Sequence, residues 1–297
     1  MLSALLLLVL YIPSSWATIE ITDSFGKHRF EQAPQRVVVV NWTLAEQLFE
    51  LGVVPLGIAD IEGYRKQVGF SEVPDNIADV GARSAPDLNA IEALKPDLII
   101  IGYSQRDLIR PLSRISRVVY FNNFSRRYNN ADKARERFLT LATLFDREAQ
   151  AQQKLQQLDT RFLAMRQQLS DHFSGELPII TVLQHDQNRC CWLYSENSLL
   201  FYTLQRLGFK TGWPQAPSKL GVSRQKLSDL SKLPGWVLIM QEASSLDLSS
   251  DPQWASLPFI KQQRYRTLAP IWSYGGVMSM LYQAEKLLPI LQTMPEK

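Results

Sequence analysis

The chain has few of the side chains that usually build metal sites and disulfides. Its only cysteines are the neighbours Cys190 and Cys191, which can join only through a strained ring, so a disulfide that closes a long loop is excluded. We expect two thiols, buried or partly buried. The histidines His28, His172 and His185 lie far apart, with no cysteine or paired carboxylates at ligand spacing. The sequence therefore gives poor support for a zinc or haem site in which the protein ligates the metal.

A strong excess of one charge is also missing. The 297 residues include 32 Lys and Arg against 29 Asp and Glu, a formal net charge of +3, and the longest basic run is Arg126-Arg127. Proteins that bind nucleic acid concentrate more positive charge than this, so we expect no nucleic-acid partner. Contents of 45% hydrophobic and 21% charged residues are those of an ordinary globular protein.

The longest apolar run, Leu2–Ile12, is too short to cross a bilayer. It leads into Pro13–Ala17, which ends in the small-x-small pattern of a cleavage site, although no Lys or Arg precedes the run. We expect residues 1–17 to be a cleaved secretory signal rather than a buried first element. No cysteine follows the run to carry a lipid, so we expect an unanchored protein in the periplasm of a double-membraned bacterium.

Two stretches of the chain repeat the same order of elements. Each gives a buried apolar strand, a helix ended by Leu-Gly, a short helix that stops before proline, and a second buried strand. The first copy covers residues 36–101 and the second covers residues 178–239. Uninterrupted apolar runs such as Val37–Val40 and Leu98–Ile101 are typical of parallel strands covered by helices on both faces. The repeat therefore predicts an α/β protein of two lobes, with mostly parallel sheets, that face each other across a cleft.

No Gly or Pro occurs from Ala131 to Phe173, so we expect helix throughout, with Asn130 as the N-cap and a break near Asp146. The second part, Arg147–Phe173, carries one apolar stripe and would reach about 40 Å. Its stripe is too short for a coiled-coil arm, so we expect one stiff helix that joins the lobes. The expected divisions are a signal peptide (1–17), a first lobe (18–145), a backbone helix (146–175) and a second lobe (176–297).

Ligands of open parallel sheets bind beyond the carboxyl ends of the strands. The side chains expected there are mostly aromatic, and Arg83 in the turn 80–86 is the distinctive cation. Such a surface fits a flat, partly apolar organic ligand that carries anionic oxygen. The candidate binding residues are Trp42, Tyr64, Arg83, Tyr103, Trp213, Trp272 and Tyr274.

Some of these candidates also fit positions outside a binding site. Trp42 fits a core position as well as a cleft position, Trp213 fits a loop surface, and Arg83 fits a solvated or helix-capping role. Trp272 and Tyr274 are favoured because the glycines that follow them, Gly275-Gly276, let backbone and ligand come close.

Motifs of catalysis are missing. The chain has no Gly-x-Ser-x-Gly elbow, no phosphate-binding glycine loop, no His-Glu-x-x-His and no Cys–His pair that spacing would favour. We therefore expect a binding protein and not an enzyme. A periplasmic enzyme or metallochaperone stays open as an alternative, with Cys190, Cys191 and His185 as its best candidate residues.

Three segments, Pro34–Asp60, Asp79–Leu88 and Leu94–Leu98, resemble the helical-backbone class (class III) of periplasmic binding proteins for ABC importers. The Gly-x-Arg turn at Gly81 and the Trp272-Ser-Tyr-Gly segment are most similar to the ferric-hydroxamate binders of that class. The resemblance implies capture of an iron(III)–siderophore and delivery to an inner-membrane ABC permease. It implies no cofactor and no metal bound directly by the protein, because the siderophore holds the iron. We expect a monomer, and haem, a corrinoid or a catecholate siderophore remain alternative ligands.

The resemblance also implies roles for single residues. Arg83 and Tyr103 match the residues that touch the hydroxamate oxygens around iron, a sensible use of a guanidinium because it donates hydrogen bonds and does not ligate metal. Trp272 and Tyr274 match the aromatic wall of the second lobe, and Trp213 matches a further tryptophan. Gln67 and Leu220 stand where the hydroxamate binder has tryptophans, so we expect a pocket of different shape.

One acidic residue from each lobe docks onto permease arginines in this class. Asp107 matches the first-lobe position. The second-lobe position matches Gln225, with Asp229 one turn away. We therefore expect docking through Asp107 and, less directly, through Gln225 or Asp229.

Overall fold

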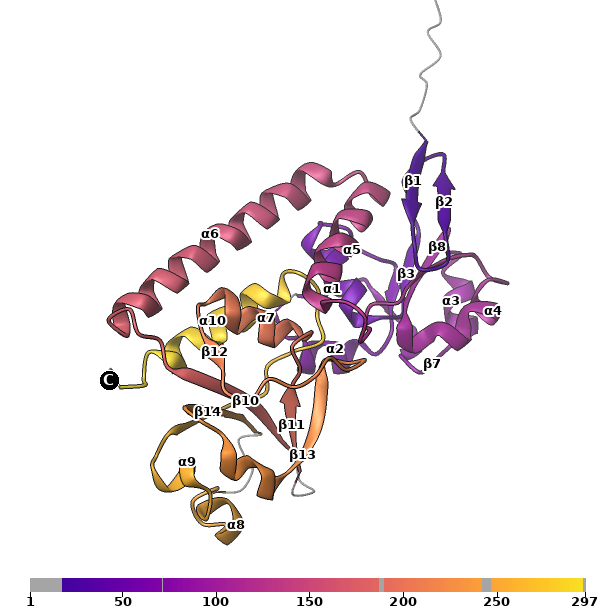
Figure 1. Ribbon diagram of the computed structural model, residues 1–297. Helices are drawn as coiled ribbons and strands as arrows, with labels where there is room; N and C mark the ends of the chain where they lie inside the picture. The colour runs from indigo at the N-terminus through magenta and orange to yellow at the C-terminus, as the bar shows by residue number, and fades with distance from the viewer. Residues whose placement is uncertain (1–17, 71, 187–189, 242–246, 296–297) are drawn as a thin grey trace, which may run out of the picture.

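The computed structural model describes residues 18–70, 72–186, 190–241 and 247–295. Figure 1 shows two α/β lobes that are joined by one long helix, α6 (Glu148–His172). The expected signal peptide, residues 1–17, lies outside the described residues and stays a prediction. Across the residues that are described, no helix combines the length and the apolarity needed to cross a membrane.

The first lobe contains an all-parallel sheet in the order β5-β4-β3-β8-β9. The buried valine and isoleucine runs expected from the sequence form its central strands, because helices cover both faces. Its strands are β3 (Val37–Val39), β4 (Gly57–Ile58), β5 (Ala78–Asp79), β8 (Leu98–Gly102) and β9 (Arg117–Phe121). Its helices are α1 (Trp42–Glu50), α2 (Ile61–Gln67), α3 (Leu88–Ala93), η1 (Tyr103–Leu108), α4 (Ile109–Leu112) and α5 (Asn130–Leu144). Two antiparallel hairpins, β1 (Ile19–Thr22) with β2 (Lys27–Phe30) and β6 (Gly81–Ala82) with β7 (Ala85–Pro86), complete the lobe.

The second lobe contains a mixed sheet in the order β13-β11-β10-β14-β15, with β12 also paired to β10. Its strands are β10 (Ile179–Asp186), β11 (Cys190–Tyr194), β12 (Lys210–Thr211), β13 (Val222–Lys226), β14 (Trp236–Met240) and β15 (Tyr265–Leu268). Its helices are α7 (Leu199–Arg206), η2 (Leu227–Lys232), α8 (Pro252–Ala255), α9 (Pro258–Lys261) and α10 (Ser279–Leu291).

The second sheet is parallel only in part, because β11 is antiparallel to both β10 and β13. Only three residues connect β10 to β11, and so short a connection leaves no room for the crossover that parallel pairing needs. The cysteine pair begins β11. Cys191 is buried, as expected, whereas the side chain of Cys190 lies outside what the structure describes.

Helices α5 and α6 occupy the stretch without glycine or proline. The expected N-cap, Asn130, is wrong by one residue: the side chain of Asn129 accepts the bond from the Ala131 N–H at 2.8 Å, while Asn130 is buried. The expected break is confirmed at Asp146, whose φ of 54° ends the helical path between α5 and α6. The division of the chain at residues 146 and 175 stays a prediction.

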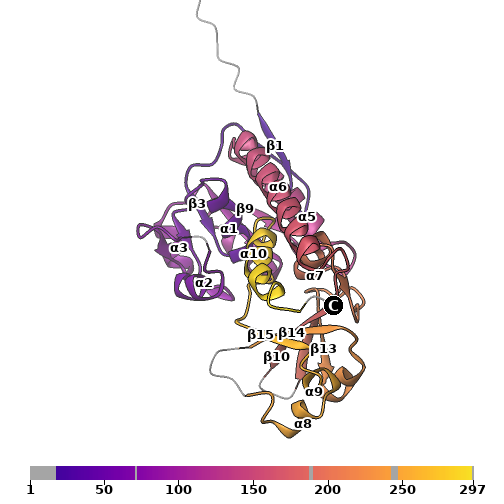
Figure 2. The same ribbon diagram turned by 90° about the vertical axis from the view of Figure 1, so that its left-hand side faces the viewer.

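Helix α6 is held to both lobes. Its Lys154 pairs with Glu50 of α1 at 2.8 Å, and its Arg161 pairs with Glu285 of α10 at 2.7 Å. Figure 2 shows α6 lying along α5 and α10. Its apolar stripe is buried in a single hydrophobic cluster that also contains residues of both sheets, of α1 and of α10. Because this core is shared by the two lobes, moving one lobe against the other would disturb close packing.

We predict that Leu158→Ala, in the buried stripe of α6, lowers the free energy of unfolding by about 2–5 kcal/mol, because it leaves a cavity in the shared core. Leu163→Ala is the matched control in the same helix, since Leu163 is 68% exposed and its change should stay within about 0.5 kcal/mol. Urea denaturation followed by tryptophan fluorescence measures both. Equal losses in the two variants would contradict a core that passes under α6.

Candidate ligand site

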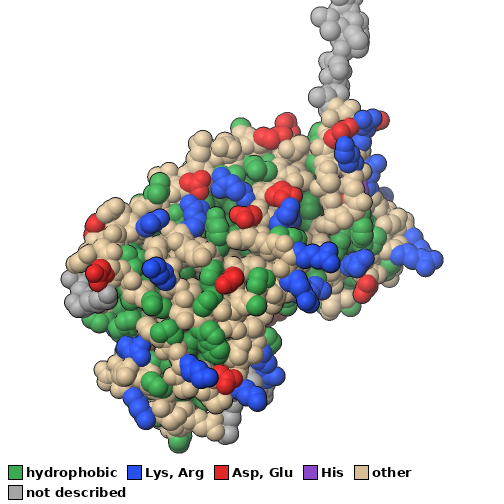
Figure 3. Space-filling model, in the orientation of Figure 1, with side chains coloured by type: hydrophobic (Ala, Val, Ile, Leu, Met, Phe, Trp, Pro, Cys, Tyr) green, Lys and Arg blue, Asp and Glu red, His purple; other side chains and the backbone are tan. Residues whose placement is uncertain are grey.

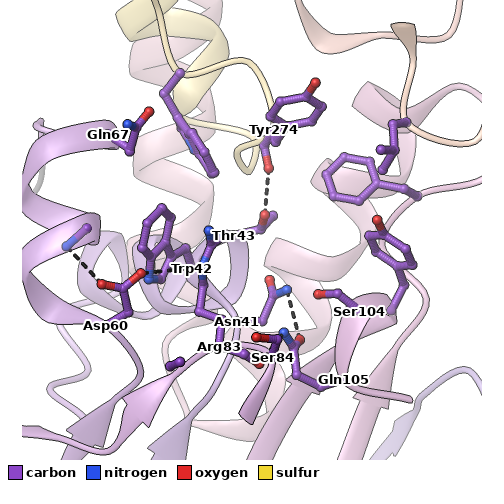
Figure 4. Close-up of a pocket in the computed structure, with 16 residues that line it drawn as sticks. Asn41, Trp42, Thr43, Asp60, Gln67, Arg83, Ser84, Ser104, Gln105 and Tyr274 are labelled. Atoms are coloured by element: carbon purple, nitrogen blue, oxygen red, sulfur yellow. Dashed lines mark hydrogen bonds and ion pairs between the residues drawn. The ribbon is translucent and has the colours of Figure 1, made fainter. Parts of the chain in front are cut away.

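A cavity of about 680 Å³ lies where the lobes meet, beyond the carboxyl ends of β3, β4 and β8 (Figure 4). The first lobe forms its floor, and a short segment of the second lobe closes it from above. The lining residues are Asn41, Trp42, Thr43, Asp60, Gly63, Gln67, Ala82, Arg83, Ser84, Tyr103, Ser104, Gln105, Phe124, Leu220, Trp272 and Tyr274. Among these residues, Asp60 and Arg83 carry the only full charges.

Arg83 stands at the tip of the β6–β7 hairpin. Gly81 makes this turn possible, because its φ is +85° and a Cβ there would come within 3.1 Å of the Asp87 backbone nitrogen. The guanidinium carbon lies 3.4 Å from the ring centroid of Trp42, and Nε lies 3.8 Å from the nearer carboxylate oxygen of Asp60. Partial burial lowers the pKa of Arg83 and Asp60 opposes that shift, so the group stays a cation. Arg83 is thus a half-buried cation whose donors face the cavity.

A buried network of three amides positions Arg83 and Tyr103. Gln105 donates to the backbone carbonyl of Arg83 at 3.1 Å and accepts from the side chain of Asn41 at 3.2 Å. Asn123 accepts from the backbone N–H of Tyr103 at 3.0 Å. Because Asn41, Gln105 and Asn123 follow β3, β8 and β9, this network ties three strand ends together. No pattern in the sequence marks Gln105 as part of this network.

Trp42 and Tyr64 differ in their placement. Trp42 lines the cavity although it is only 4% exposed, and its Nε1 donates to the Ala59 carbonyl at 2.8 Å. Tyr64 does not line the cavity: it is fully buried and packs edge-on against Trp42, with ring centroids 6.1 Å apart. The expectation that Tyr64 contacts a ligand is therefore wrong. It lies on the inward face of the short helix α2, where it supports Trp42 from behind.

The second-lobe wall is aromatic, as expected. Trp272 faces Trp42 with ring centroids 5.8 Å apart, and Tyr274 packs edge-on against Trp272 at 5.9 Å. Phe124 continues this wall beside Tyr274 at 6.1 Å and beside Tyr103 at 5.8 Å. Phe124 was missed because it lies past the strand end, in a loop with no periodic pattern.

Of the remaining residues singled out from the sequence, some line the cavity and others do not. Gln67 and Leu220, the positions of departure from the hydroxamate binders, both line the cavity. Trp213 does not: it is half-buried and packs against the hydrophobic cluster that contains Trp254 of α8 and Phe259 of α9, so its role in binding stays a prediction. His185 likewise packs edge-on against Trp254, at 5.2 Å, away from the cavity.

The docking candidates lie at the surface to different degrees. Asp107 is exposed on η1, four residues after Tyr103. Gln225 is half-buried, and its side-chain amide donates to Gln215 at 2.7 Å. Asp229 is half-buried on η2. Contact with a permease through these residues stays a prediction.

Glu46 of α1 fastens the second-lobe wall to the first lobe. It is 1% exposed and accepts hydrogen bonds from Trp272 Nε1 at 3.0 Å, from the Ser279 hydroxyl at 2.7 Å and from the Gly276 backbone N–H. Thr43, one turn earlier, donates to the Tyr274 carbonyl at 2.5 Å. Burial raises the pKa of Glu46 to about 8, and the three donors oppose the rise only in part. The wall of the cavity therefore depends on one buried carboxyl group.

No cluster of three or more His, Cys, Asp or Glu side chains that could hold a metal ion occurs in the part of the chain that the structure describes. The site offers a ligand one cation, Arg83, which is paired with the Asp60 carboxylate, together with several aromatic faces and neutral hydrogen-bonding groups. This arrangement can recognise anionic oxygen and hold flat apolar groups.

Comparison with known proteins identifies the class. The chain belongs to the periplasmic binding protein family, whose description matches residues 37–271. This family consists of substrate-binding proteins that serve transport. Together with the two lobes and the long helix, the match confirms the predicted fold class, a class III periplasmic binding protein.

Particular members share most of the chain. The siderophore-binding protein FhuD of Vibrio cholerae, solved with Fe³⁺-Desferal bound, is 39% identical with a TM-score of 0.84, over 87% of this chain and 98% of that one. The iron(3+)-hydroxamate-binding protein FhuD of Escherichia coli (strain K12) is 26% identical, over 84% of each chain. The Fe(3+)-citrate-binding protein YfmC of Bacillus subtilis (strain 168) is 26% identical, over 90% of this chain and 84% of that one. The predicted resemblance to ferric-hydroxamate binders is thus confirmed.

We predict that Glu46→Gln removes a pH dependence of stability. Because folding raises the pKa of Glu46 from its ordinary value of 4.5 to about 8, its stabilising contribution is complete below about pH 4.5 and is lost as the pH rises through 8. The free energy of unfolding should therefore fall over this range by more in the native sequence than in the variant, the difference being on the order of a few kcal/mol. Urea denaturation at pH 5, 6.5 and 8 measures it.

The exposed carboxylate Glu62, changed to Gln, is the control and should keep the pH profile of the native sequence. Parallel profiles for Glu46→Gln and the native sequence would show that Glu46 binds no extra proton in the folded state.

Proposed function

We propose that this protein captures an iron(III)–siderophore, with hydroxamate chelators favoured, and delivers it to an inner-membrane ABC importer. The observation that carries the proposal is the position of Arg83 on the floor of an aromatic cavity. A guanidinium there can donate to the chelating oxygens while the siderophore keeps all its bonds to iron. The relatives solved or named with hydroxamate ligands support the choice of chelator.

The cavity fits such a ligand in size and in surface. Its volume of about 680 Å³ lies in the range of sites for compact organic ligands. Trp42, Trp272 and Tyr274 offer faces to the apolar linkers of a siderophore, while Tyr103 and Arg83 offer donors to its oxygens. Partial burial raises the pKa of Tyr103, which keeps its phenol protonated and able to donate.

The setting of this function is part of the proposal. The protein would act as a monomer in the periplasm and dock onto the permease with one surface of each lobe. Asp107 is the first-lobe docking residue. In the second lobe Asp229 is the better candidate, because the amide of Gln225 is already held by Gln215.

We predict that Arg83→Ala weakens binding of a ferric hydroxamate by about 1.5–3 kcal/mol, the contribution of a charge-assisted contact. Arg83→Lys should recover part of this loss, since lysine keeps the charge but not the stacked, forked geometry. Tyr103→Phe should cost less because the ring remains. Quenching of tryptophan fluorescence by the ferric complex measures each affinity.

The control for charge is Arg114→Gln, which removes one exposed cation of the same lobe outside the cavity. Native affinity in Arg83→Ala would remove Arg83 from the site. A panel of ferric hydroxamates, ferric catecholates, haem and cobalamin, titrated in the same way, tests the ligand class: tighter binding of any other class than of hydroxamates would contradict the proposal.

We further predict that ligand binding changes the radius of gyration by less than about 1 Å. Lobe closure is opposed by the shared core, by the ion pairs of α6 with both lobes and by the bonds of Glu46. Small-angle scattering with and without the ligand measures this. A contraction of several ångström would mean that the lobes move as separate bodies.

A further inference from the structure

A second hollow, of about 580 Å³, adjoins the ligand cavity. The two share Tyr103 and Phe124, which therefore lie where one hollow meets the other. Four cations line the second hollow together with aromatic and neutral polar side chains. Its lining residues are Ser24, Phe25, Tyr103, Arg106, Tyr120, Asn122, Phe124, Ser125, Arg126, Arg127 and Lys219.

The side chains that line this hollow carry only positive charge. No carboxylate is among its described lining residues, and none of Arg106, Arg126, Arg127 and Lys219 forms an ion pair with any residue that the structure describes. The ligand cavity, in contrast, balances Arg83 against Asp60. Figure 3 shows Lys and Arg side chains gathered on this face of the molecule where the first lobe borders the second. Four like charges around one hollow create a local potential that favours an anion.

The loop that carries the two arginines is fixed in place. The backbone N–H of Ser125 donates to the Asn130 side chain of α5 at 3.2 Å, and its carbonyl accepts from the Asn197 side chain of the second lobe at 2.8 Å. The Arg127 N–H donates to the Ser125 hydroxyl at 3.1 Å. The backbone that presents Arg126 and Arg127 is thus held from both lobes, which lowers the entropy that ordering would cost on binding.

Lys219 brings the second lobe to the same hollow. Its Nζ lies 4.6 Å from the ring centroid of Tyr103, on the wall shared with the ligand cavity. A group bound between Lys219 and the arginines would therefore lie directly beside the ligand cavity, against Tyr103 and Phe124.

We propose that this hollow is an anion subsite, which holds a carboxylate carried on the periphery of the siderophore while the iron-bound oxygens lie near Arg83. The proposal rests on the proposed function, and it narrows the substrate to siderophores that carry a pendant carboxylate outside the chelating groups. A guanidinium binds a carboxylate through two parallel hydrogen bonds, so Arg126 and Arg127 are the chief specificity residues, with Arg106 and Lys219 adding charge.

Two capped forms of one chelator test the subsite. Desferrioxamine B has a terminal amine outside its three hydroxamates; acetylation makes the ferric complex neutral, and succinylation gives the same complex one pendant carboxylate. The native sequence should bind the succinylated complex about tenfold more tightly at low ionic strength, from two or more charge contacts. The preference should shrink at 0.5 M salt. Fluorescence quenching measures both affinities.

The double variant Arg126→Gln with Arg127→Gln should bind the succinylated complex as weakly as the acetylated one, and its affinity for the acetylated complex should match that of the native sequence. Arg114→Gln is the control for net charge and should keep the preference. Should the double variant fail to fold, Lys219→Gln probes the same hollow from the other lobe and should reduce the preference several-fold.

Equal binding of the two complexes by the native sequence would overturn the subsite and leave the proposed function standing. So would a preference that survives in both the double variant and Lys219→Gln. Binding of neither complex would count against the proposed function itself and, with it, the subsite.

Discussion

The cavity exists because one buried carboxyl group, that of Glu46, joins the two lobes at the place where they meet. Trp272 and Tyr274 lie on a segment without regular structure, which would not hold their rings in place by itself. Glu46 accepts bonds from Trp272, Gly276 and Ser279, so it fixes this segment at both of its ends. Gly276 has to be glycine for this approach, since a Cβ there would come within 2.4 Å of the Gln47 side chain. The second-lobe wall is thus built on a first-lobe helix.

The floor of the cavity is held by neutral amide side chains and not by a buried carboxyl group. Asn41, Gln105 and Asn123 satisfy one another and the nearby backbone, so they position the Arg83 backbone and Tyr103 without adding an ion to the pair that Arg83 forms with Asp60. A carboxylate in place of Gln105 would compete with the ligand for Arg83. Gly102 leaves room for the network, because a Cβ there would come within 2.3 Å of the Asn41 side chain. Cation and amides together create a pocket that is polar on one side and nearly neutral overall.

The sequence predicted those features that follow from periodicity or from a special backbone. Strands β3 and β8, helix α6 and the break at Asp146 follow from apolar runs and from the absence of helix breakers, whereas Arg83 follows from the resemblance of its Gly-x-Arg turn to the hydroxamate binders. Tyr64 was misplaced, because an aromatic ring near a strand end fits the cavity and the layer behind it equally well. Gln105 and Glu46 could not be found, since a buried polar residue is recognisable only by partners distant in sequence: Arg83 is 22 residues away from Gln105, and Trp272 is 226 residues away from Glu46.

Because the cavity is formed before the ligand binds, recognition depends on the side chains that line it and not on closure of the lobes. In a binding protein that closes on its ligand, part of the interaction energy is used to move the lobes; here the shared core and Glu46 hold them close together already. Selectivity among ligands must then come from side chains that are already in position before the ligand binds. The aromatic faces of Trp42 and Trp272 accept many flat groups without strong preference. Directional and charged groups such as Arg83, and the cations beyond Tyr103, are therefore the parts of this surface that can separate one chelate from another. Exposed charges act over about a Debye length, so the cations beyond Tyr103 would also raise the association rate of an anionic ligand. A rigid site keeps this gain in rate, because no lobe movement has to follow the encounter.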